Sequence, residues 1–126
     1  MIPLPALTAL LTYRLTLQPE DFRVAAEGLA TRVRAEGDPG VLSYRFFVDS
    51  GETARAVVDY RDTAAWMGHH RMIGGWPEMA ALRQAAVVTE IVFLGDVTDE
   101  MLAWLSAAGI TATIRSGNAL AAGFVR

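Results

Sequence analysis

The chain contains no cysteine and no lysine, and its only asparagine is Asn118. Without cysteine the protein can form neither a disulfide nor a thiolate metal site, which fits a cytoplasmic protein. All 11 basic residues are arginines, and the net charge of −3 gives no basic surface for nucleic acid. We therefore expect no nucleic-acid partner and a cytoplasmic location.

Long apolar runs are also missing. No run reaches the roughly 18 apolar residues that span a membrane, so we expect no membrane partner. The apolar beginning, MIPLPALTALLTYRL, has no basic segment in front of it, so we expect no signal peptide. The chain is nevertheless 52% hydrophobic, with a mean hydropathy of +0.28 over 126 residues. This apolar excess in a single small domain predicts a surface buried in an oligomer.

Four segments are predicted to be β-strands from their apolar patterns. They are residues 7–17, 41–48, 54–60 and 86–94. The second and third are joined only by the turn DSGET, which is too short for a crossover. These two strands therefore form an antiparallel hairpin.

Helices are predicted after the first and third strands. Pro19 begins one helix and Gly37 ends it. Asp62 is the expected N-cap of the other, which the glycine pair at 74–75 ends, and Pro77 begins a further short helix. This order predicts an α+β fold, the ferredoxin-like split βαβ pattern with a four-stranded antiparallel sheet. Helices would cover one face of the sheet, and a second copy would cover the other in a homodimer.

Residues 97–126 extend this core, residues 7–95, within one domain of 126 residues. Thr98 is the expected start of a helix that Gly109 ends, and residues 110–115 are predicted to form a short strand. The extension is too apolar for a free linker. We expect it to pack on the domain or on its partner.

The segment PGVLSYRFFVDSGETARAVVDYRDTAAWMGHH, residues 39–70, resembles the antibiotic biosynthesis monooxygenase domain family of the dimeric α/β-barrel superfamily. The positions that match the family pattern are Pro39, Gly40, Ser43, Tyr44, Asp59, Tyr60, Asp62, Ala64 and His69. The resemblance implies a dimeric α/β barrel. For some members it implies oxidation of phenols or quinols by O₂ without a metal or organic cofactor. Other members degrade haem, so the family does not fix the reaction.

The candidate site lies in YRDTAAWMGHHRMIGGW, residues 60–76. At about 100° per residue, Trp66, His69 and Ile73 share one side of a helix. His69, which matches the family histidine, is the candidate catalytic base, because an imidazole can accept a phenol proton in a dry site. The alternative is a half-buried structural histidine bonded to a backbone carbonyl or to Asp62. His70 lies at the edge of this face and is expected to point toward solvent more than toward a ligand.

Several other side chains are candidate substrate contacts. They are Trp66, Tyr44, Tyr13, His70 and Trp76. Tryptophans could form a wall on which a flat phenolic ligand stacks, and the strand tyrosines, with Tyr60, could share one cavity. Packing in the core and sheet is the alternative for all of them. The adjacent histidines diverge by about 100° on a helix, so we expect no metal.

Two strand arginines and one acidic residue lie on the opposite sheet face. Arg14, Arg45 and Asp59 are expected to pair across a dimer interface, since an arginine inside a strand needs an anion or a place at the rim. Capture of a ligand anion is the alternative.

Together these observations predict a homodimeric, cofactor-independent monooxygenase that acts on a phenol, a quinol or a similar flat small molecule. The alternative is a non-catalytic small-molecule-binding or interaction module of the same fold. Haem binding or degradation is the third hypothesis. The resemblance implies a polar amide near the first strand for haem degradation, and Asn118 lies far from that strand in the sequence.

Overall fold

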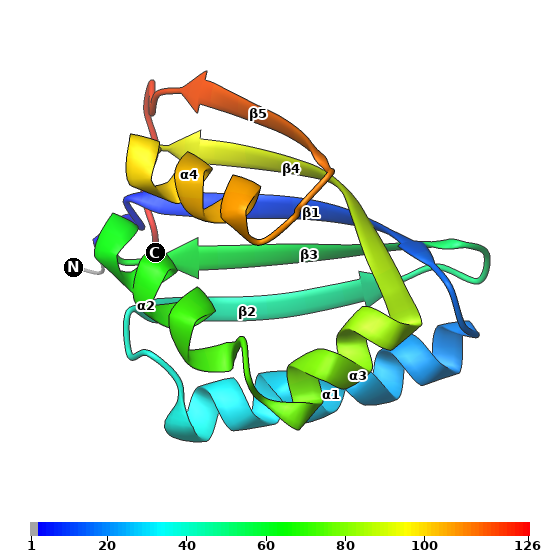
Figure 1. The fold of residues 1–126 in the computed structure, drawn as a ribbon. Helices are drawn as coiled ribbons and strands as arrows, with labels where there is room; N and C mark the ends of the chain where they lie inside the picture. The colour runs from blue at the N-terminus through cyan, green and yellow to red at the C-terminus, as the bar shows by residue number, and fades with distance from the viewer. Residues whose placement is uncertain (1–2) are drawn as a thin grey trace.

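The fold is α+β (Figure 1). The structure is a computed structural model and describes residues 3–126. Its elements are β1 (Leu7–Leu15), α1 (Pro19–Glu36), β2 (Val41–Val48), β3 (Thr53–Tyr60), α2 (Thr63–Ile73), α3 (Pro77–Ala85), β4 (Ala86–Gly95), α4 (Asp99–Ala107) and β5 (Thr113–Asn118). The order from β1 to β4 is the predicted one, and it is consistent with a ferredoxin-like fold. No helix among these residues is long and apolar enough to cross a membrane.

The sheet has five strands in the order β2-β3-β1-β4-β5. Strands β1 to β4 pair antiparallel, whereas β5 pairs parallel with β4. The predicted four-stranded antiparallel sheet is therefore corrected to an open, mixed sheet of five strands. The physical reason is the crossover through α4, which returns the chain to the same end of the sheet and makes parallel pairing possible. The last strand also lies a few residues later than the predicted segment 110–115.

Local signals explain where the helices begin. Pro19 occupies the first turn of α1, where a missing backbone N–H costs nothing. The Asp62 side chain accepts a hydrogen bond from the Ala65 backbone N–H at 2.8 Å and caps α2. In the same way, Thr98 accepts a bond from the Met101 N–H at 3.1 Å and caps α4.

Two groups of buried side chains hold the helices on one face of the sheet. The first joins α2 and α4 to the middle of the sheet through residues such as Trp66, Phe93 and Met101. The second joins α1 and α3 to the opposite end, around Phe22 and Leu29. The first part of the extension therefore packs on its own domain, with α4 beside α2 over the sheet (Figure 1), whereas the side chains of residues 115–126 are exposed.

The other face of the sheet carries exposed apolar side chains. Phe47 and Leu42 on β2 are 52% and 51% exposed, and Leu94 on β4 is 41% exposed. Leu10 and Val57, which pair across β1 and β3, are only partly buried. No helix within residues 3–126 covers this face.

Candidate functional site

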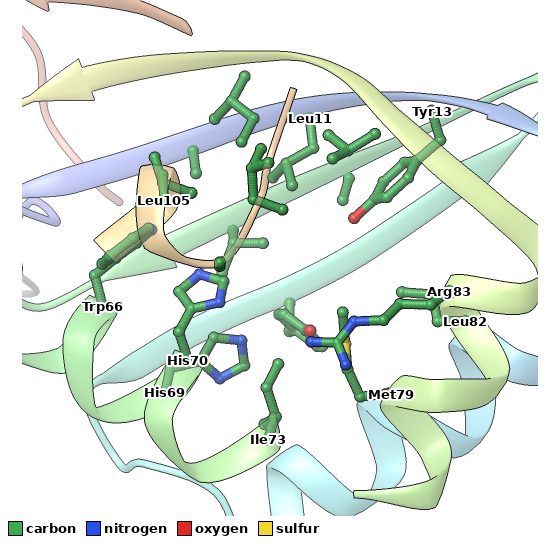
Figure 2. A pocket seen from close by; sticks show the side chains of 18 of the residues that line it. Leu11, Tyr13, Trp66, His69, His70, Ile73, Met79, Leu82, Arg83 and Leu105 are labelled. Atoms are coloured by element: carbon green, nitrogen blue, oxygen red, sulfur yellow. The ribbon is translucent and has the colours of Figure 1, made fainter. Parts of the chain in front are cut away.

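A cavity of about 440 Å³ lies between the sheet and helices α2, α3 and α4 (Figure 2). Its lining is mostly apolar, with a few polar groups from the strands and from α2 and α3. Both the volume and this composition are typical of sites for small organic molecules.

His69 projects from α2 into this cavity and is only 1% exposed. The centroid of its ring lies 5.1 Å from that of Tyr44 and 5.8 Å from that of Tyr60. Its Nδ1 is buried and has no hydrogen-bond partner among residues 3–126. The structural alternative placed a backbone carbonyl or Asp62 at this ring, but the Asp62 carboxylate instead caps the helix and pairs with Arg61. A buried polar atom without a partner is costly, so a bound molecule that satisfied it would gain affinity.

Burial keeps both histidines neutral. It lowers the pKa of His69 to about 4, although the nearby Asp38 carboxylate opposes the shift. For His70, burial, the neighbouring His69 and the positive charge of Arg83 all lower the pKa well below its usual value. A neutral imidazole has a free lone pair on one nitrogen, so each ring can accept a proton or a hydrogen bond.

The expectation that His70 points to solvent is wrong. Its ring lies between two indoles, with centroid distances of 4.3 Å to Trp66 and 5.0 Å to Trp104. Trp104 comes from α4, which covers the edge of α2 that the helical pattern leaves open. Trp66, His70 and Trp104 thus form a continuous aromatic wall of the cavity.

The strand tyrosines share the cavity. Tyr13, Tyr44 and Tyr60 all line it, from three neighbouring strands. Burial raises the pKa of each phenol, so all three remain neutral hydrogen-bond donors. Figure 2 shows the Tyr13 hydroxyl directed into the space between the sheet and the helices.

Trp76 does not line this cavity, so its predicted ligand contact is not supported. Its ring stacks on the Arg32 guanidinium of α1, 4.1 Å from the ring centroid. Arg32 also pairs with Glu78 at 2.7 Å. The physical reason is the turn at Gly74 and Gly75, after which α3 packs along α1 and the indole follows it.

The charged residues of the opposite sheet face do not pair with one another within residues 3–126. Asp59 accepts a hydrogen bond from the Thr8 hydroxyl at 2.6 Å. Arg14 and Arg45 are exposed and make no ion pair in this part of the chain. Their pairing across a dimer stays a prediction.

Three residues near the cavity were missed by the sequence interpretation. Arg83 lines the cavity from α3, and the Asp38 carboxylate lies near His69, but no pattern in the sequence links either residue to the histidines. Trp104 lies on α4, and nothing in the sequence links that helix to the histidines. The spacing of Met101 and Leu105 does indicate the buried side of α4, and the partly buried Trp104 lies at its border.

Among the described residues, no group of three histidine, cysteine, aspartate or glutamate side chains could hold a metal ion. The polar groups of the cavity are instead imidazoles, phenols and one guanidinium. This set can accept a proton from a ligand and stabilise a negative charge that forms on it.

Several solved structures have a fold similar to that of this chain. No family model and no curated protein match the chain. MupZ from Pseudomonas fluorescens is similar with a TM-score of 0.67 and 19% identity, covering 95% of this chain and 93% of that one. SnoaB, a cofactor-independent oxygenase from Streptomyces nogalater, is similar with a TM-score of 0.61 and 15% identity, covering 73% and 93%. A protein from Caulobacter crescentus, whose name assigns it to the antibiotic biosynthesis monooxygenases, has a TM-score of 0.55 and 22% identity, covering 75% and 92%.

These similarities confirm, at the level of fold, the resemblance to the antibiotic biosynthesis monooxygenases. The match to MupZ leaves about 5% of this chain uncovered, so it includes most of the 30-residue extension at residues 97–126.

Proposed function

We propose that this protein is a cofactor-independent monooxygenase that oxidises a phenol, a quinol or a similar flat small molecule with O₂. The observation that carries the proposal is the unpartnered, buried Nδ1 of His69 beside a largely apolar cavity of about 440 Å³. The fold shared with a cofactor-independent oxygenase supports it.

The reaction balances for a phenol with a hydrogen para to its hydroxyl. His69 takes the hydroxyl proton, and the phenolate transfers one electron to O₂. The resulting phenoxyl radical and superoxide combine at the para carbon, and the peroxide formed there takes up a proton. Loss of the para hydrogen as a proton, with cleavage of the O–O bond, releases water and leaves a quinone. One oxygen atom of O₂ enters the product and the other leaves as water.

His69 suits the first step because of its surroundings. A pKa of about 4 means that the imidazole of the empty site is unprotonated at neutral pH, although it is a weak base there. Once the ligand becomes a phenolate, the opposite charge beside the ring raises the imidazole pKa and stabilises the pair. The neutral hydroxyl of Tyr44, whose ring lies 5.1 Å from that of His69, is the candidate donor to the phenolate oxygen, and the wall of Trp66 and His70 would hold the ring.

Oxygen uptake by the purified protein with 1-naphthol or anthrone, both of which have a hydrogen para to the hydroxyl (in anthrone, in its enol form), with no cofactor added, tests this function. We expect uptake above the rate with heat-denatured protein, and a loss of about 100-fold or more in His69→Ala, as for loss of a general base. Met72→Ala, an exposed change on the same helix, is the matched control and should keep the wild-type rate.

Full turnover in His69→Ala would refute the role of this residue. Tight binding of these compounds without oxygen uptake would instead favour the alternative, a non-catalytic binding module.

We also propose that the protein is a homodimer that acts in the cytoplasm. The exposed apolar side chains of Leu42, Phe47 and Leu94 lie on the sheet face that no helix of residues 3–126 covers. A second copy would bury this face and bring Arg14 and Arg45 of each chain near acidic groups such as Asp59 of the other. The absence of cysteine supports a reducing compartment.

A further inference from the structure

The cavity has a charge that the proposed oxidation does not use. Among the described residues that line it, Arg83 alone is charged at neutral pH, because the histidines and tyrosines are neutral. No aspartate or glutamate lines it. Figure 2 shows the Arg83 side chain reaching from α3 into the cavity, on the side opposite His69 and His70 and below the Tyr13 hydroxyl.

Arg83 has no carboxylate partner among residues 3–126. Its single hydrogen bond runs from Nη1 to the Gly74 carbonyl oxygen at a long 3.4 Å. The acidic residue on its own helix, Glu78, is already paired with Arg32. Arg32, by contrast, is surrounded by two carboxylates and an indole, as expected for an arginine with a structural role.

Arg83 is accessible to solvent and also borders the mostly apolar cavity. The residue as a whole is exposed, so its charge is hydrated in the empty protein and lies at the mouth of the cavity. A ligand that displaced this water would have to supply the counter-charge. A single guanidinium presents a planar pair of N–H donors, which matches one carboxylate in a bidentate arrangement. The fork also fits a phosphate, but a phosphate monoester carries a charge of about −1.5 to −2 at neutral pH, which one guanidinium would only partly balance.

We propose that Arg83 is the binding site for a carboxylate on the substrate, so that the ligand is a flat, apolar carboxylic acid. The proposal rests on the proposed function for the reacting end of the molecule. The acid group would lie at the mouth on Arg83, with the Tyr13 hydroxyl as a second donor. The ring would extend into the cavity toward Trp66 and His69, where the proton is removed.

The experiment is a binding titration that follows tryptophan fluorescence, because Trp66 and Trp104 line the cavity. The probes are 2-naphthoate and 2-naphthamide, which share a shape and differ in charge. Hydrogen bonds to a charged group are stronger than those to a neutral amide, so the wild type should bind naphthoate at least about tenfold more tightly than naphthamide.

Arg83→Gln should remove this preference, and Arg83→Lys should retain part of it. Arg34→Gln, an exposed change near the end of α1 and outside the cavity, is the matched control and should leave both affinities unchanged. In turnover, Arg83→Gln should raise KM for an acidic phenol at nearly constant kcat.

The possible outcomes separate this inference from the proposed function. Equal binding of the two probes by the wild type would overturn the carboxylate site, whereas oxygen uptake with neutral phenols would still stand. A naphthoate preference that survives in Arg83→Gln would assign the anion to another group and also overturn the inference. Failure of both probes to bind would overturn the aromatic site itself, and the proposed function with it.

Discussion

Acid should weaken this protein through its buried histidines, and the contribution of His69 follows from its surroundings. The pKa of His69 is lowered from 6.5 to about 4 in the folded chain, chiefly by burial and against the attraction of Asp38. Below pH 6.5 the unfolded chain therefore binds a proton at His69 that the folded chain does not take up. The contribution to stability is fully present above pH 6.5 and is lost as the pH falls toward 4.

The size of the effect follows from the shift. A difference of about 2.5 pKa units corresponds to about 3 kcal/mol over the whole range. Between pH 7 and pH 5, where the native state should still dominate, the loss is about 2 kcal/mol. The ring is 1% exposed, so solvent screening hardly reduces this figure. For a domain whose total stability is about 5–15 kcal/mol, such a loss is readily measured.

Urea unfolding at pH 7 and pH 5, at one protein concentration, measures it. His69→Phe is the comparison, because phenylalanine keeps an aromatic ring beside Tyr44 and Tyr60 and does not titrate. Distant carboxylates titrate in both proteins and cancel in the difference. His69 itself lowers the pKa of His70, so part of the His70 contribution is lost with the His69 ring and adds to the difference. The wild type should lose about 2 kcal/mol more than His69→Phe between the two pH values. An equal loss in both proteins would show that His69 is protonated as easily in the folded chain as in water, and the reasoning from burial would fail.

Two further predictions concern packing and assembly. A Cβ added at Gly68 in α2 would overlap the Asp38 carboxylate, whose other oxygen accepts the Gly40 N–H at 2.8 Å. Gly68→Ala should therefore destabilise the protein by about 1 kcal/mol in thermal unfolding, although alanine has the better helix propensity. Gly28→Ala in α1 is the control. Its added Cβ makes only an ordinary contact at 3.9 Å to Glu78, so it should stabilise the protein by up to about 1 kcal/mol. Light scattering should give twice the 13.6 kDa chain mass at micromolar concentration, and Val57→Arg on the open sheet face should give a monomer. Val24→Arg on the exposed side of α1 should stay dimeric, and a monomeric wild type would refute the interface.

The helices could be predicted from the sequence because their signals are local. Pro19, Asp62 and Thr98 begin helices within the segments that contain them, and each does so through its own ring or side chain. The end of β1 was predicted at residue 17 but lies at Leu15. The alternating pattern continues past that point, whereas the Thr16 backbone and hydroxyl turn to carbonyls at the end of α3, at 2.9 and 2.6 Å. That contact joins residues far apart in the sequence, so no local pattern could reveal it.

The same limit explains the errors in the candidate site. The helical pattern placed Trp66 and His69 on one side of α2, and the structure brings both to the cavity. His70 lies at the edge of that side, and its surroundings depend on α4, more than 25 residues later in the chain. The indole of Trp76 could stack on a flat ligand, but the direction of this side chain depends on how α3 packs against α1.

The residues that line the cavity come from two different parts of the chain. The proposed proton acceptor, His69, and Tyr44 come from the segment that resembles the monooxygenase family. Trp104, Leu105 and Ile110, which close the cavity on one side, come from the extension, and the match to MupZ includes most of that extension. A change of substrate requires a change in the shape of the walls, whereas a change of reaction requires a change in the groups that move protons. In this chain the shape of the cavity wall can change through substitutions in α4 without altering α2. We therefore expect the extension to set which flat molecule fits, and residues 39–70 to set what happens to it.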